Sequence, residues 1–342
     1  MALEITRWNK FNSETHRHPE GVALCKESSQ VLYKPRPARD DSSEPFLPFH
    51  RALRECSQWD ELGHRFLVSI FDGGIGAVPV PKDPSPENLI GEEEVLVATA
   101  PFPHLSNLGF RIDHARNRVV GCASDKFHYA LSTVVAYDYD TWETLFVIKL
   151  QEGADNKSLA DDLTIDADGH IYVTDTYNGK IWKINADGSD FCVFSDDPQY
   201  QIEPINKYYG WVKLNGIAYH PHGFLLVTHL ASHSLFKVSM DGKTVTKVGG
   251  LTRELLGDGI VLQDPNTLVM CGLDVGVHVL KTTDDWNTAA EALHSPAKSS
   301  TLIPTSVSLK HGKPYVGFAN LTPEDPPVDL IASPEFSPLS SV

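Results

Sequence analysis

The sequence is poor in cysteine, in positive charge and in long apolar runs, and each shortage excludes a class of protein. Five cysteines at wide spacings, with no CxxC pair, disfavour a zinc knuckle or a disulfide framework and predict reduced thiols. The 29 basic residues stand against 45 acidic ones, and a net charge of −16 would repel a phosphate backbone. No stretch approaches the roughly 20 apolar residues of a membrane span, and the N-terminus shows no signal-peptide core. We therefore expect a cytoplasmic protein that binds neither nucleic acid nor a membrane.

Sequence motifs of several enzyme classes are also missing. The chain has no P-loop and no GxGxxG motif, and Ser232 and Ser234 lack the setting of a nucleophile elbow, which disfavours a serine hydrolase. There is no alternation of strand and helix patterns. What the chain does contain is 24 glycines and 23 prolines, a content that suits many tight turns.

A short pattern recurs along the chain: a polar residue, a glycine or second polar residue, an apolar strand, a turn and another apolar strand. Its first position falls at Glu20, Asp161, Asn215 and Asp258, with weaker copies at Leu108 and Thr305. The intervals are 161 − 108 = 53, 215 − 161 = 54, 258 − 215 = 43 and 305 − 258 = 47 residues. Periods of about 45 residues with several short strands are typical of a β-propeller.

We predict an all-β fold, a six-bladed β-propeller whose four-stranded antiparallel blades surround a central channel, as one domain over residues 1–342. The interval from Glu20 to Leu108, 108 − 20 = 88 residues, is too long for one blade and predicts an insertion at about 35–64 within blade 1. Within it Phe49–Trp59 has a short helical pattern, which could be a lid or surface decoration. The proline- and serine-rich end, 326–342, is expected to be loosely held.

The first positions of the pattern predict a metal site. Equivalent positions of different blades converge at one end of the channel, which would bring together Glu20, Asp161, Asn215 and Asp258. Unpaired carboxylates held together repel each other, and a divalent cation relieves the repulsion. Oxygen ligands suit a hard ion, Ca²⁺ as the first expectation and Mg²⁺, Mn²⁺ or Zn²⁺ as alternatives. The other interpretation is that these residues are turn formers, since Asp-Gly and Asn-Gly are common in turns.

The same segments resemble a known family, the senescence-marker-protein/gluconolactonase/regucalcin (SGL-type) six-bladed propellers. The segments that carry the likeness are Pro19–Val22, Asp161–Asp166, Leu214–Ile217 and Gly257–Ile260. A plant branch of SGL-like proteins is suggested by Lys157–Asp162 and Tyr219–Leu225. The likeness covers most of the chain and is weak in the insertion and the last blade.

The resemblance implies a ligand set and a chemistry. Its metal ligands match Glu20, Asn215 and Asp258, while Asp161 departs from the asparagine that the family often has there and adds a carboxylate. The cation would polarise a lactone carbonyl or a phosphoryl oxygen, and Asp258 would activate water or act as the nucleophile. We expect His229 to transfer protons, by residue type. Loops between second and third strands offer candidate substrate contacts at His128, Tyr129, Tyr177 and His233.

We therefore predict a monomeric, metal-dependent hydrolase that acts on a lactone or related ester of a small molecule. Two alternatives stay open. One is a non-hydrolytic cyclase, isomerase or condensing enzyme of specialised metabolism on the same propeller, and the other is a non-catalytic scaffold of the NHL or WD type. The blade pattern alone fixes neither the substrate nor the ion, because one fold hosts many functions.

Overall fold

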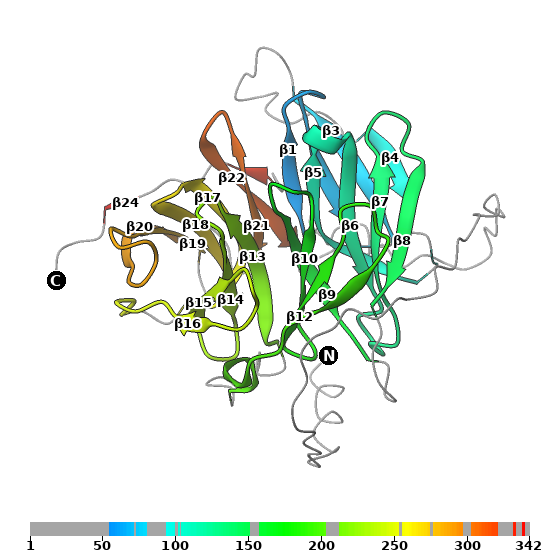
Figure 1. Ribbon diagram of the computed structural model, residues 1–342. Helices are drawn as coiled ribbons and strands as arrows, with labels where there is room; N and C mark the ends of the chain where they lie inside the picture. The colour runs from blue at the N-terminus through cyan, green and yellow to red at the C-terminus, as the bar shows by residue number, and fades with distance from the viewer. Residues whose placement is uncertain are drawn as a thin grey trace, which may run out of the picture.

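The structure is a computed structural model, shown in Figure 1. It describes residues 55–71, 73–80, 94–99, 102, 104–150, 157–202, 212–252, 255–273, 276–296, 302–320, 331–332 and 337–338. Glu20, most of the predicted insertion and most of the predicted loose end lie outside the described residues. Among the residues that are described, no helix reaches the length and apolar character needed to cross a membrane.

The first three sheets have four strands each and follow the chain in order. The first sheet contains β1 (Ser57–Asp60), β2 (Arg65–Ile70), β3 (Gly74–Pro79) and β4 (Glu94–Thr99). The second contains β5 (Ser106–Asp113), β6 (Arg118–Ser124), β7 (Ser132–Asp138) and β8 (Thr144–Lys149), with the 3₁₀ turn η3 (His114–Arg116) between β5 and β6. The third contains β9 (Ala160–Ile165), β10 (Ile171–Asp175), β11 (Lys180–Ile184) and β12 (Phe191–Ser195).

The other three sheets complete the described part of the fold, after the 3₁₀ turn η4 (Pro198–Gln201). The fourth contains β13 (Leu214–His220), β14 (Phe224–His229), β15 (Ser234–Ser239) and β16 (Val245–Lys247). The fifth contains β17 (Gly257–Asp264), β18 (Thr267–Gly272), β19 (Gly276–Lys281) and β20 (Ala290–Pro296), with β24 (Ser337–Pro338) added at the β20 edge. The sixth contains β21 (Leu302–Lys310), β22 (Lys313–Asn320) and β23 (Ile331–Ala332).

The first strands of the sheets form a closed ring. Strand β5 contacts β1 and β9, β13 contacts β9 and β17, and β21 contacts β17 and β1. Figure 1 shows β9, β13 and β21 near the middle, with β4, β8 and β20 toward the outside. The prediction of an all-β propeller with antiparallel four-stranded blades is confirmed. In the described part of the chain, five sheets have four or five strands and the sixth has three.

The core lies between neighbouring sheets rather than at one centre. Strands β10, β14 and β18 are buried along their whole length, because each blade packs against a neighbour on both faces. One apolar cluster joins the second and third sheets through Val134, Leu163 and Trp182. Outer strands such as β8 and β16 are more exposed. Apolar runs therefore mark the middle strands of the blades. The packing of the blades in a ring brings the starts of the first strands together.

The predicted insertion is partly wrong. Residues 55–64 were assigned to it, yet Ser57–Asp60 is strand β1, paired antiparallel with β2 from Ser57–Val68 to Asp60–Arg65. The end of the Phe49–Trp59 segment, for which a short helical pattern was expected, is extended, and the Trp59 ring packs in the first blade, 5.1 Å from Phe66 between ring centroids. The first blade therefore includes residues that the sequence analysis placed in the insertion.

Candidate active site

The candidate site lies near the start of the first strand of each blade, where the pairing with the second strand changes register. Residue pairing with the second strand shifts register between Asn107 and Phe110 in β5, between Leu214 and Ile217 in β13, and between Gly257 and Ile260 in β17. Similar shifts occur where β9 pairs with β10 and where β21 pairs with β22. The predicted first positions of these five strands all lie within the shift: Leu108, Asp161, Asn215, Asp258 and Thr305. The sequence alignment therefore had the correct register in five blades.

In the described part of the first blade the equivalent residue is Glu55, while Glu20 lies outside the described residues. Ser57 pairs with Val68 at the position of the blade where Leu163 pairs with Val173 in the third sheet. Glu55 precedes Ser57 by two residues, as Asp161 precedes Leu163. The spacing could have revealed it, because 108 − 55 = 53 residues matches the next interval of 53. Sequence reasoning missed Glu55 because Cys56 follows it where glycine was expected.

The glycines of the pattern allow neighbouring blades to pack closely, because glycine has no Cβ atom. A Cβ atom on Gly109 would lie 2.6 Å from the carbonyl oxygen of Asp161, and one on Gly259 would lie 2.6 Å from the carbonyl oxygen of Thr305. On Gly216 it would collide with the carbonyl oxygen of Asp258. Carbonyl groups of the next first strand therefore require glycine there, and the same packing brings the first positions toward the channel.

One cavity at the start of the first strands gathers most of the predicted ligands. Its volume is about 20 Å³, roughly the room for one water molecule or one ion. Its charged and amide side chains come from five of the six first strands and from the residue two positions before β1: Glu55, Gln58, Arg111, Asp161, Asp162, Asn215 and Asp258. Any organic substrate must therefore lie at the mouth, with only a reacting group directed inward.

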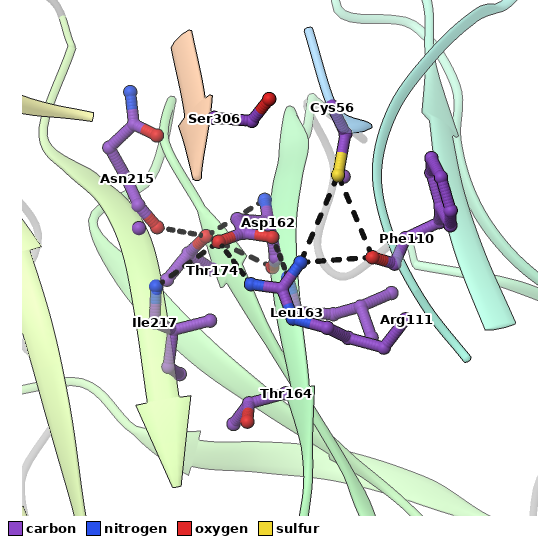
Figure 2. A network of polar contacts seen from close by, with 12 residues as sticks. Cys56, Phe110, Arg111, Asp162, Leu163, Thr164, Thr174, Asn215, Ile217 and Ser306 are labelled. Atoms are coloured by element: carbon purple, nitrogen blue, oxygen red, sulfur yellow. Dashed lines mark hydrogen bonds and ion pairs between the residues drawn. The ribbon is translucent and has the colours of Figure 1, made fainter. Parts of the chain in front are cut away.

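Two of the four cavity carboxylates have a cationic partner. The Nη2 atom of Arg111 lies 2.9 Å from Oδ2 of Asp162, and its Nη1 donates to the carbonyl oxygen of Phe110 at 2.9 Å. Figure 2 shows Arg111 between Asp162, Phe110 and Cys56. Glu55 is paired with Lys126, whose Nζ lies 2.5 Å from Oε1. No sequence signal singled out Arg111, Asp162 or Lys126, because these pairs join different blades.

Asp161 and Asp258 carry the remaining negative charge. Burial, reinforced by the negative charge of Glu55, raises the pKa of Asp161 to about 7. Burial raises the pKa of Asp258 well above its usual value, and Glu55 and Asp161 add to the effect. With all four carboxylates ionised and two cations present, the cavity has two negative charges left over, the charge that one divalent cation balances.

The donor set fits a hard cation. Glu55, Asp161, Asn215 and Asp258 offer oxygen atoms from four blades around a space of ionic size. Elsewhere in the described part, ligand atoms of three residues lie within 4.8 Å of one another in His220, His222 and Asp285, and in Asp166, Asp168 and His170. Both groups include residues of turns that join first to second strands, at the other end of the blades. The cavity acids are spread more widely, and a cation would draw them inward.

The other predicted residues lie outside the cavity lining. His229 is fully buried, with Nδ1 2.6 Å from Oγ of Ser232 and Nε2 3.1 Å from the carbonyl oxygen of Tyr200. Burial lowers its pKa to about 4, so its ring is neutral at ordinary pH. These contacts hold the β14–β15 turn, and the geometry offers no support for proton transfer by His229.

The predicted substrate contacts lie in loops at the correct end of the blades. Ala160, at the start of β9, pairs with Asp175 at the end of β10, so loops between second and third strands flank the cavity end. In these loops the rings of Tyr129 and Tyr177 lie 4.8 Å apart. The His128 side chain is 81% exposed, and His233 has a left-handed backbone with a φ of 49°. Their contact with a substrate stays a prediction.

Comparison with known proteins supports the fold. The family model for the NHL repeat matches residues 159–184, which span β9 to β11. A search of curated proteins finds no match. Among solved structures, the allergen Mala s 1 of Malassezia sympodialis is 14% identical with a TM-score of 0.59, covering 79% of this chain and 90% of its own.

Two enzymes are among the similar structures. The gluconolactonase XC5397 of Xanthomonas campestris is 15% identical with a TM-score of 0.55, covering 88% of this chain and 96% of its own. A catalytically inactive virginiamycin B lyase of Staphylococcus aureus, solved with quinupristin, is 14% identical with a TM-score of 0.54 and 80% coverage of both chains. The chain is thus a β-propeller with an NHL-repeat match, and it shares its fold with a gluconolactonase and a lyase.

Proposed function

We propose that the protein is a metal-dependent hydrolase of a lactone or related small-molecule ester. The cation, Ca²⁺ first, would be held by Glu55, Asp161, Asn215 and Asp258. The observation that carries the proposal is that two carboxyls lining the cavity, the partly buried Asp161 and the buried Asp258, have no cationic partner of their own there. Glu55 takes the place that was first inferred for Glu20. The SGL-type affinity, including its plant branch, belongs to this proposal.

Asp258 and Asn215 would have different roles in the reaction. Asp258 is 7% exposed and lines the cavity, where a bound cation would favour its ionised form. Its carboxylate can then take the proton of a water that attacks an ester placed at the mouth. Asn215, also 7% exposed, is neutral and can bind a cation or a polar group without adding charge. A bound cation would supply Lewis acidity toward the carbonyl oxygen of the ester.

The charge of the cavity favours a neutral substrate. Arg111 is held by Asp162 and by the Phe110 carbonyl, so its guanidinium is already compensated. Binding one divalent cation would bring the cavity close to neutrality and leave little attraction for an anion. A neutral lactone or ester meets no such penalty, and its carbonyl is the group that needs activation.

Calorimetric titration of chelator-stripped protein with Ca²⁺, Mg²⁺, Mn²⁺ and Zn²⁺ tests the proposal. We expect one ion per chain, with affinity lost in Asn215→Ala and Asp258→Ala and kept in Asp187→Ala, which removes a carboxylate from a surface turn. Cation-dependent turnover of a panel of neutral lactones and esters should follow the same pattern. Absence of binding for every ion would contradict the proposal and favour an NHL-type scaffold.

A second candidate is a lyase or another non-hydrolytic reaction at the same cavity, favoured by the likeness in fold to virginiamycin B lyase. Reaction in ¹⁸O-labelled water separates the two. Hydrolysis places one labelled oxygen in the carboxylate product, whereas elimination or isomerisation places none. A product without label, formed with the same dependence on Asp258, would replace the hydrolase by this alternative.

A further inference from the structure

Lys126 contacts Glu55, one of the residues that line the cavity, from a loop. It lies between β6 and β7 of the second sheet, at the end where the first strands begin. Its Nζ is 2.5 Å from Oε1 of Glu55, which belongs to the first sheet, and 4.4 Å from the centroid of the Phe71 ring. The Lys126 side chain is 22% exposed, so the ammonium is in contact with solvent as well as with Glu55.

The backbone that carries Lys126 is held firmly. Oδ1 of Asp125 accepts hydrogen bonds from the backbone N–H groups of Phe127 at 3.1 Å and of His128 at 3.0 Å. The N–H of Tyr129 donates to the Asp125 carbonyl at 2.9 Å, and the N–H of Ser158 donates to the Tyr129 carbonyl at 3.0 Å. The long Lys126 side chain can therefore change direction without rearrangement of its loop.

The second sheet, whose β6–β7 loop carries Lys126, offers no polar side chain at the first position of the pattern. Leu108 is the first position of the second sheet, between Glu55 and Asp161 in the order of the blades. Burial raises the pKa of Asp161 and of Asp258, and the positive charge of Lys126 acts in the opposite direction on both. One ammonium therefore acts on three of the acidic side chains that would hold a cation.

We propose that Lys126 is a tethered cation that competes with the divalent cation for Glu55. This inference rests on the proposed metal site. In the protein free of metal, the ammonium partly neutralises the acidic side chains. Binding of a divalent ion requires the Glu55 carboxylate and places a second positive charge next to the ammonium. The like charges repel, and the Lys126 side chain moves from Glu55 toward the mouth. Lys126 then sets the cation affinity.

The first test is calorimetric titration of Ca²⁺ into chelator-stripped Lys126 variants. Lys126→Met removes the charge and keeps an unbranched chain over Phe71, and we expect affinity to rise about tenfold. Lys126→Arg keeps the charge and should bind like the original protein. Lys157→Met is the matched control: this lysine lies over the Tyr177 ring at 5.8 Å, and its loss should leave affinity unchanged.

The second test follows the side chain in the unaltered protein. Brief acylation with acetic anhydride, read out peptide by peptide by mass spectrometry, reports the accessibility of each lysine. Saturating Ca²⁺ should raise the acylation of Lys126 at least about threefold relative to Lys157. A role in holding the loop alone would not produce this change, because the loop contacts do not involve the Lys126 ammonium.

The outcomes separate this inference from the proposed function. If Ca²⁺ binds the original protein and Lys126→Met with equal affinity, or if Lys126 stays protected in the loaded protein, competition is refuted while the metal site stands. If neither protein binds any of the four ions, the metal site itself is refuted and the competition with it. Binding detected in Lys126→Met alone would support competition, with the lysine as the stronger occupant.

Discussion

Replacement of Asp161 by asparagine should make the metal-free protein more stable, although it removes a proposed ligand. In the folded protein the carboxyl has a pKa of about 7, whereas an unfolded chain returns it to about 3.8. The folded state therefore binds more protons between these values, and its stability falls as pH rises from about 4 to 7. The introduced asparagine side chain cannot ionise, so the variant escapes this loss.

The magnitude follows from the pKa difference. A shift of 7 − 3.8 = 3.2 units corresponds to at most about 4 kcal/mol at pH 8, since one unit is worth about 1.4 kcal/mol. Asp161 keeps some exposure to solvent, which reduces the effect. We expect Asp161→Asn to exceed the original protein by about 2–4 kcal/mol at pH 8, and to match it near pH 4, where both side chains are neutral.

Urea unfolding of chelator-stripped protein, followed by tryptophan fluorescence, measures this difference, because Trp182 and Trp286 are buried. Asp140→Asn, at an exposed turn, is the control and should show no pH-dependent gain. Cation at about a thousand times its Kd should reverse the order, since it adds about 4.1 kcal/mol to the protein that binds it. A variant that is less stable than the original at pH 8 without metal would refute the reasoning.

Further predictions concern the ring and its glycines. Glu55→Gln should weaken cation binding at least about tenfold by calorimetry, and an equal loss in Glu20→Gln would instead favour the ligand first inferred from the sequence. Gly216→Ala should destabilise the protein by about 1–3 kcal/mol in urea, since the added Cβ meets the Asp258 carbonyl. Burial lowers the pKa of His229 to about 4, so the stability of the protein should fall as pH drops from about 6.5 to 4. His229→Gln should reduce this pH dependence and leave kcat unchanged. A large loss of kcat in this variant would support the predicted catalytic role.

The sequence predicted what depends on local repetition. A polar residue followed by glycine recurs because the carbonyl of the next first strand passes within contact distance, and this placed Asn215 and Asp258 in one register. Even the weak copies at Leu108 and Thr305 lie at the same structural position. The pattern was not recognised in the first blade because Cys56 stands at the position of the glycine.

Sequence reasoning did not anticipate contacts between distant parts of the chain. His229 was chosen by residue type, but its nitrogen atoms are used by Ser232 and Tyr200 in a buried turn. The pair of Arg111 and Asp162 joins residues 51 positions apart, and the pair of Lys126 and Glu55 joins residues 71 positions apart. No periodic pattern encodes such pairs, because each occurs once in the ring.

The polar side chains of the site are distributed unevenly around the ring of blades. Asp161, Asn215 and Asp258 come from three consecutive blades, whereas Glu55 is separated from them by Leu108 on one side and Thr305 on the other. A cation held by the three neighbours would lie off the channel axis, and Glu55 would have to reach toward it from the opposite side. Lys126, from the β6–β7 loop of the second sheet, pairs with Glu55. Thr305 carries no charge, and under the proposed function a neutral ester would approach the cation from its side.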